Sequence, residues 1–119
     1  MLPDNHTIEL PAGDSRRVVV PVVDDQGAAV PLAGATIRWW VAKNAKATGA
    51  AVFIKKSSTS EIEIDSEASA FSFTIIPVDT DGVRPDTYYH EAEITFPDNS
   101  VSTVLRGSLR ITPTLIRGA

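Results

Sequence analysis

The residues of this chain that could take part in acid–base or metal chemistry are two histidines and two groups of acidic side chains. His6 and His90 are too few for a metal site without carboxylates at defined spacing. The sequence has no Gly-x-Ser-x-Gly elbow to expose a nucleophile and no glycine-rich phosphate loop. It also lacks cysteine, which excludes thiolate catalysis, Cys-ligated zinc and disulfides. We therefore expect no enzyme, no catalytic residue and no cofactor.

The acidic side chains allow one metal hypothesis, which is calcium. Acidic residues alternate along Glu61–Asp65, and three aspartates crowd the loop from Asp79 to Asp86. Calcium is bound by oxygen ligands that several loops can supply. The alternative is a solvated strand face and ordinary turn residues. Because EF-hand spacing is absent, we favour this alternative and predict no metal site.

The elements that position these residues are predicted to be strands. Apolar and polar residues alternate with a period of two, and no long stretch keeps a helical period. Pro77–Gly82 fits a single helical turn, Ala42–Ala51 is predicted to be a loop, and Pro21 indicates an edge strand or a bulge. The expected strands are Ile8–Leu10, Arg16–Val23, Thr36–Ala42, Val52–Lys56, Glu61–Asp65, Phe71–Ile75, Tyr88–Phe96 and Val101–Ile111.

The alternation also predicts which faces are buried. In Val101–Ile111 the odd positions, from Val101 and Thr103 onward, form the apolar face, and Pro97–Ser100 suits a hairpin turn. Lys55, Lys56, Arg106 and Arg110 are expected at the surface. We expect a common core of Ile37, Trp39, Val41, Phe71, Phe73, Tyr88, Ile94, Leu105 and Leu109.

About seven to nine short strands separated by turn signals predict an all-β fold, a single antiparallel β-sandwich spanning residues 1–119. The stretch Asp79–Tyr89 resembles the tyrosine corner of immunoglobulin-like domains, with Tyr88 bonded to backbone within Pro77–Pro85. His90 then stands where true immunoglobulin domains have their second cysteine, and Trp39 resembles their core tryptophan. Without cysteines, the resemblance implies an immunoglobulin-like sandwich that has no disulfide.

A second resemblance covers roughly residues 15–115. The chain is similar to immunoglobulin-like structural proteins of bacteriophage and prophage tails and baseplates. This resemblance implies a viral structural protein, a virion component made in the bacterial cytoplasm that binds other tail or virion proteins in ring-like assemblies. The segments that carry it are Ala35–Ala42, Glu61–Asp65, Ile76–Thr80, Pro85–Glu91, Ser102–Gly107 and Leu109–Pro113.

Trp40 is the strongest candidate for a partner-binding residue, and Arg38 lies beside it on the same face. If Trp39 points into the core, alternation places Trp40 on the opposite face. Tryptophan is enriched at binding hot spots. We also expect self-association through a sheet face or edge, with the long strand Val101–Ile111 as one exposed edge. The competing possibility is a monomer whose edges are shielded by loops.

Composition narrows the remaining function classes. The net charge of −4 gives no electrostatic reason to bind nucleic acid or an anionic membrane. The first residues have neither the basic nor the apolar region of a signal peptide, so we expect no secretion by that route. The leading hypothesis is a non-enzymatic tail assembly protein. The alternatives are a carbohydrate-binding or adhesion module of the same fold, and a chaperone or regulator from the same gene cluster.

Overall fold

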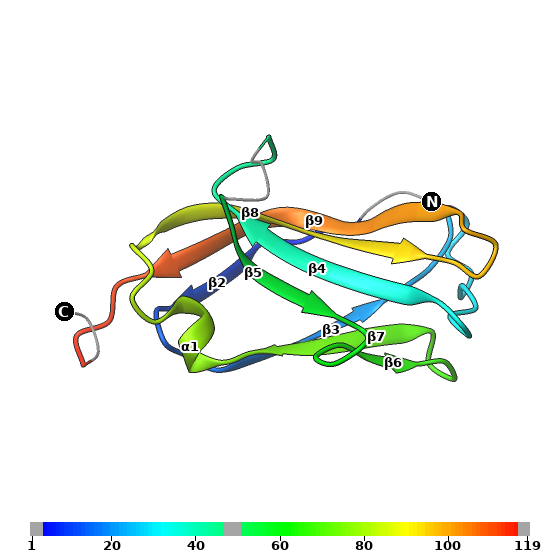
Figure 1. Ribbon diagram of the computed structural model, residues 1–119, viewed down its shortest axis with the longest axis horizontal. Coiled ribbons are helices and arrows are strands. Elements are labelled where there is room, and N and C mark those ends of the chain that lie inside the picture. Colours follow the sequence, from blue (N-terminus) through cyan, green and yellow to red (C-terminus); the bar gives the residue numbers. More distant parts are fainter. Residues whose placement is uncertain (1–3, 47–50, 117–119) are drawn as a thin grey trace.

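The computed structural model describes residues 4–46 and 51–116, in which two β-sheets pack face to face (Figure 1). The chain order is β1 (Asp4–Asn5), β2 (Ile8–Pro11), β3 (Arg16–Pro21), β4 (Thr36–Ala42), β5 (Val52–Ser57), β6 (Glu63–Asp65), β7 (Ala70–Ile75), α1 (Pro77–Thr80), β8 (Asp86–Thr95) and β9 (Val101–Thr112).

The strand pairing confirms the all-β sandwich. The first sheet has the order β1-β9-β8-β4-β5, with β2 also paired to β9, and the second has the order β3-β7-β6. Strands β4, β8 and β9 correspond to C, F and G of an immunoglobulin-like sandwich, and β3, β7 and β6 to B, E and D. The sandwich is not wholly antiparallel, because β1 and β2 run parallel to β9.

The core lies between the sheets, as the alternation predicts. Ile37, Trp39 and Val41 are fully buried along β4, and the Trp39 ring stacks on Phe73 of β7 with ring centroids 4.2 Å apart. Of the nine predicted core residues, eight are buried, and Tyr88 is half-buried and packs against them. The predicted loop 42–51 begins after β4, and part of it lies outside the described residues.

A bulge in β9 overturns the predicted alternation at its start. Ala92 pairs with Leu105 and Glu93 with Thr103, so Val104 is an extra residue in β9. Val104 and Leu105 are both buried, and Val101 is 55% exposed. One inserted residue moves the side chains on its far side to the opposite face. The prediction that Val101 and Thr103 share the face of Leu105 is therefore wrong.

The predicted edge role of β9 is also wrong. This strand pairs with β8 on one side and, from Leu105 onward, with β1 and β2 on the other, so most of its length is not an edge. Among the described residues, β1, β2, β5, β3 and β6 each pair with a strand on one side only. Pro21 lies in β3, which confirms the prediction of an edge position.

The helical turn predicted at Pro77–Gly82 is present as α1. The prediction that Lys56 lies at the surface is wrong, because Lys56 is buried and paired with a residue of α1. Lys56 is only 5% exposed, because the alternation of β5 turns it inward beside Ile54. Its Nζ lies 2.8 Å from Oδ2 of Asp79 in α1, and this carboxylate provides the charge partner that a buried ammonium requires. No helix among the described residues is long and apolar enough to cross a membrane.

The tyrosine corner is present. The Tyr88 hydroxyl donates to the carbonyl oxygen of Arg84, within the predicted region. Burial raises the pKa of Tyr88, and the charge of Asp86 adds to the effect. The bond therefore links the start of β8 to the segment that arrives from α1.

We expect Tyr88→Phe to lower the free energy of unfolding by about 0.5–1.5 kcal/mol, the usual contribution of one such hydrogen bond. The ring keeps its edge-on contact with Phe53, so little else is lost. Urea unfolding measures the difference. Tyr89→Phe is the control, since it removes a hydroxyl that bonds to the exposed side chain of Glu91; an equal loss in both variants would argue against a special role for the corner.

His90 links the core to the N-terminal segment. It is fully buried, as expected for the position of the second immunoglobulin cysteine. Trp39 Nε1 donates to His90 Nδ1 at 3.1 Å, and Nε2 lies 2.7 Å from the carbonyl oxygen of His6. His90 is therefore a neutral ring with its proton on Nε2. A Cβ at Gly107 would lie 2.1 Å from the His6 carbonyl oxygen, so only glycine permits this approach.

We expect stability to fall as the pH decreases below about 6.5, the ordinary pKa of histidine. Burial lowers the pKa of His90; the hydrogen bond to the His6 carbonyl opposes this shift only in part, and the charge of the His6 side chain adds to it. In that range the unfolded chain binds a proton that the folded chain excludes, so the free energy of unfolding drops by at most about 1.4 kcal/mol per pH unit for this group.

The measurement is urea unfolding at several pH values for the wild type and two variants. His90→Gln can still accept from Trp39 and donate to His6 but cannot titrate, so its pH dependence should be shallower. His6→Gln should keep most of the wild-type dependence, because the His6 backbone makes the bond. Identical pH profiles for all three proteins would contradict this account.

Candidate functional site

Trp40 lies on the outer face of the first sheet, as the alternation predicts. Its neighbours in β4, Trp39 and Val41, are fully buried, whereas Trp40 is half-buried and borders two surface hollows. The Lys55 ammonium sits 4.5 Å from the centroid of its ring, and the Arg38 guanidinium carbon 5.9 Å. Arg38 is therefore beside Trp40, as predicted, and both cations contact the ring.

Strand pairing places further side chains around Trp40. Trp40 is aligned with Lys55 of β5 and with Glu91 of β8, and Arg38 is aligned with Glu93. Antiparallel pairing brings side chains that are aligned in this way into contact. We call this surface the Trp40 face and define it by Arg38, Trp40, Lys55, Tyr89, Glu91 and Glu93.

Two hollows flank the Trp40 ring. One, of about 120 Å³, lies between Arg38, Trp40, Glu91 and Glu93. The other, of about 160 Å³, has Trp40, Glu91 and Tyr89 along one side. Its remaining lining comes from Ala42, Val52 and the loop residues Asn44 and Ala45. An aromatic ring between two concave regions offers both apolar area and room for a partner's side chains.

The charged groups of the Trp40 face hold one another in place. Arg38 pairs with Glu93, and the Tyr89 hydroxyl donates to Glu91 Oε2 at 3.0 Å. Burial raises the pKa of Tyr89, and the Glu91 hydrogen bond adds to the effect. Arg106 of β9 is aligned with Glu91 on its other side. The face therefore presents ordered cations and carboxylates around an apolar centre.

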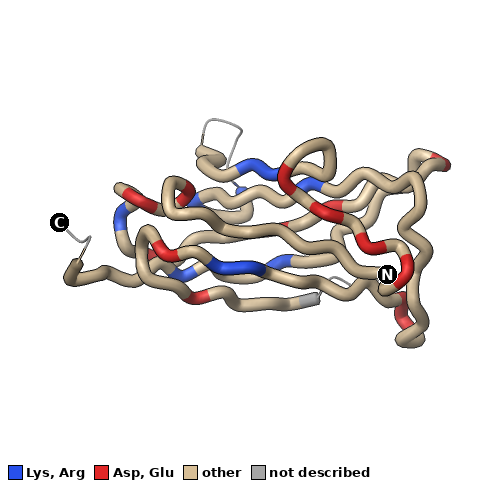
Figure 2. The backbone as a smooth tube through the Cα atoms, turned by 90° about the horizontal axis from the view of Figure 1, so that it is seen from below, with Lys and Arg blue, Asp and Glu red and all other residues tan. Residues whose placement is uncertain are grey.

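The acidic groups considered for calcium are not gathered into a metal site. Within residues 4–46 and 51–116 there is no cluster of three or more His, Asp or Glu side chains that could hold an ion. The Glu61 carboxylate accepts from the Ser57 amide at 3.3 Å and from the Ser60 hydroxyl. Figure 2 shows acidic positions following one another along the side of the second sheet that β6 forms.

Part of the Trp40 face is missing from the sequence-based prediction. Alternation assigns Tyr89, Glu91 and Glu93 to the outer side of β8, but it does not say which strand lies next to β8. The partners of Trp40 come from β5 and β8, and the β8 partners lie about 50 residues further along the chain. Pairing between strands, which one sequence does not reveal, brings these side chains together. No protein-family model matches this chain, and no curated protein does either.

Proposed function

We propose that this protein is a non-enzymatic assembly component that binds a partner protein through the Trp40 face. The observation that carries the proposal is the half-exposed Trp40 ring, set between two hollows and ringed by paired charges. Buried aromatic anchors surrounded by polar contacts are typical of binding hot spots. Rigid strands hold the anchor, so little conformational entropy is lost when a partner binds.

The sequence resemblance to tail and baseplate proteins supports a phage or prophage tail as the setting. An immunoglobulin-like sandwich on a small chain is suited to repeated protein contacts. The proposed partners are other tail or virion proteins. A carbohydrate-binding role is less well supported, because the Lys55 ammonium covers part of the ring on which a sugar would stack.

Trp40→Glu should weaken the partner contact while the domain stays folded, since the side chain lies outside the core. Loss of a hot-spot tryptophan typically costs about 2 kcal/mol or more, or roughly 30-fold in Kd. The measurement is the amount of the protein in purified tail particles of the phage or prophage that encodes it, for wild type and variant. Trp40→Phe, which retains an aromatic anchor, is the matched control.

Two results would refute the proposal. If the wild-type protein is absent from tail particles and is strictly monomeric in sedimentation over a wide concentration range, no assembly role remains. If Trp40→Glu is incorporated as well as wild type, the assembly role survives but the Trp40 face is not the contact. Binding on a glycan array that Trp40→Glu abolishes would favour the carbohydrate module instead.

A further inference from the structure

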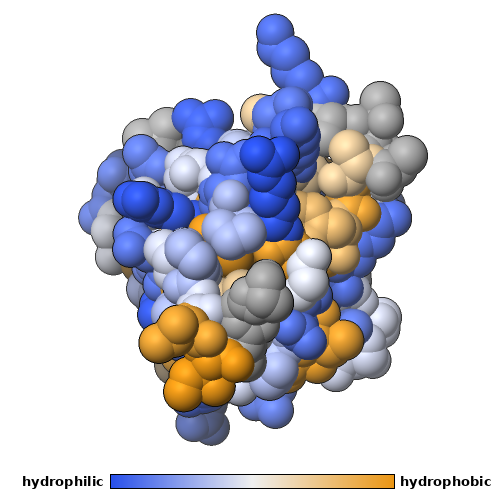
Figure 3. Space-filling view, turned by 90° about the vertical axis from the view of Figure 1, so that its left-hand side faces the viewer, coloured by the Kyte–Doolittle hydropathy of each residue, from blue (hydrophilic) through white to orange (hydrophobic). Residues whose placement is uncertain are grey.

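The most exposed large apolar side chains among the described residues follow β9. Leu115 is 100% exposed and Ile116 is 90% exposed, and Arg117 comes next in the sequence. Figure 3 shows apolar side chains gathered at the end of the molecule where α1 and this segment lie. Exposed apolar side chains that neighbour one another mark contact sites more often than isolated ones do.

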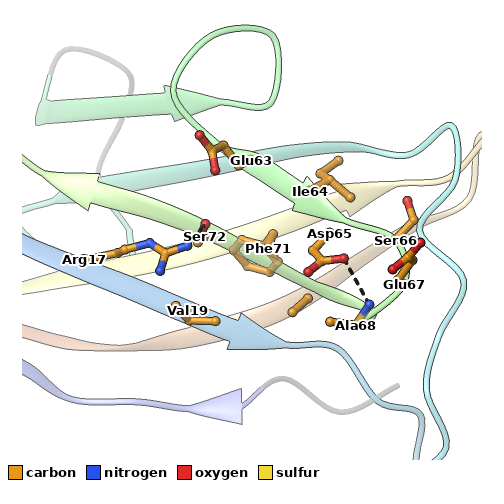
Figure 4. Close-up of a pocket in the computed structure, with 11 residues that line it drawn as sticks. Arg17, Val19, Glu63, Ile64, Asp65, Ser66, Glu67, Ala68, Phe71 and Ser72 are labelled. Carbon is orange, nitrogen blue, oxygen red and sulfur yellow. Dashed lines mark hydrogen bonds between the residues drawn. The ribbon is translucent and has the colours of Figure 1, made fainter.

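A groove on the outer face of the second sheet has the complementary shape. It is about 550 Å³ and crosses β3, β7 and β6. Its floor is low because the outward side chains of the central strand are the small Ala70 and Ser72. Figure 4 shows Val19 on the β3 side and Glu63 and Asp65 on the β6 side. We call this site the β7 groove.

The walls of the β7 groove differ in chemistry. Val19 is 52% exposed and offers an apolar wall. Glu63, Asp65 and Glu67 make the opposite side acidic, and among the described residues none of these three carboxylates forms an ion pair. Arg17, the one cation among the described residues that line the groove, is at its edge and donates to Ser72 Oγ at 3.4 Å. The groove thus suits a short segment that carries both apolar side chains and a positive charge.

In sequence, Leu115, Ile116 and Arg117 form such a segment, but Leu115 and Ile116 are not placed to reach the groove of their own chain. Figure 1 shows the segment after β9, up to residue 116, and the β6 strand at opposite ends of the long axis, which measures 46 Å. A contact between them therefore joins two molecules. When a segment at one end of a molecule binds a groove near the opposite end of a second copy, the two copies meet head to tail. Repetition of this contact produces a ring or a filament.

We propose that the β7 groove binds the segment Leu115–Arg117 of a second copy of this chain. Leu115 and Ile116 pack against Val19 and over Ala70, and the Arg117 guanidinium meets the carboxylates of the β6 side. The β7 groove lies on the second sheet, and the contact involves no residue of the Trp40 face. It can therefore be tested independently of the proposed partner site.

The first test is the molar mass of the 119-residue chain by sedimentation over a range of concentrations. Wild type should form species larger than a monomer, and Leu115→Ser/Ile116→Ser should remove them. Glu63→Lys/Asp65→Lys should also remove them, because it reverses the acidic wall without touching the core. Glu9→Lys, an exposed change on the other sheet, is the control and should behave as wild type. Trp40→Glu should leave this assembly in place.

A charge exchange makes the test specific. Arg117→Glu alone should abolish assembly, and combining it with Glu63→Lys/Asp65→Lys should restore it. The second test titrates a capped, fluorescent peptide of residues 112–119 with the Leu115→Ser/Ile116→Ser chain, whose groove is intact. The peptide should bind, and should lose binding to the protein that also carries Glu63→Lys/Asp65→Lys. A monomeric wild type, no peptide binding, or a failed charge exchange would each overturn the proposal.

Discussion

Replacing Trp39 by alanine should lower the free energy of unfolding by about 3–5 kcal/mol, as deletions of buried aromatic side chains do. Trp39 is fully buried and stacks on Phe73. The substitution leaves a cavity between the two sheets and removes the donor that satisfies His90 Nδ1. A loss of this size approaches the whole stability of a small domain. Urea unfolding followed by circular dichroism measures it.

Two controls separate the cavity from the hydrogen bond. Trp39→Phe keeps most of the apolar volume but leaves the buried His90 acceptor without its donor, so its cost should be smaller and close to that of the bond, about 1–3 kcal/mol. Trp40→Ala removes the same type of side chain from the outer face and should cost much less. If Trp39→Ala unfolds at the wild-type urea concentration, the core assignment of this residue is wrong.

Asp79→Ala should be nearly as damaging, with a loss of about 3–5 kcal/mol, because it leaves the Lys56 ammonium buried without a partner. The side chains of the pair are 6% and 14% exposed, and they are 2.8 Å apart. Asp79 Oδ2 also accepts from the Ile76 amide at 2.9 Å, at the start of α1. The substitution therefore removes a counter-ion and a helix cap together.

A double variant tests whether the buried charge is the cause. Lys56→Met with Asp79→Asn removes both charges and keeps a side-chain oxygen near the Ile76 amide. Its stability should be much closer to wild type, since replacing a buried pair is often neutral. The exposed pair of Arg38 and Glu93 is the control, and breaking it should cost at most about 1 kcal/mol. If the double variant is as unstable as Asp79→Ala, the isolated charge is not the reason.

The fold could be predicted from the sequence as far as each strand could be recognised by itself. Thr36–Ala42 was bounded correctly, and the inward side of β4 followed from its alternation. The errors arose where one strand depends on another. The bulge at Val104 is visible only in the pairing of β9 with β8. The burial of Lys56 depends on a carboxylate that α1 supplies from elsewhere in the chain.

In the candidate site too, features of a single strand could be predicted, whereas features that depend on the pairing of strands could not. The outward direction of Trp40 and the position of Arg38 beside it followed from the alternation within β4. Lys55 and the β8 side chains could not be assigned to the site, because neither local pattern nor composition states which strands are neighbours. The β7 groove was equally hidden, since it depends on small side chains of β7 lying between the longer ones of β3 and β6.

The parallel pairing of β1 and β2 with β9 has a consequence for synthesis of the protein. Asp4 is aligned with Leu105, so β1, which leaves the ribosome about 100 residues earlier, has no partner until β9 emerges. At ordinary translation speeds this delay is roughly 5–20 s. Until β9 emerges, β8 has a bare edge and the His6 carbonyl has not reached His90. High contact order of this kind slows folding and leaves the nascent chain open to aggregation or chaperone binding.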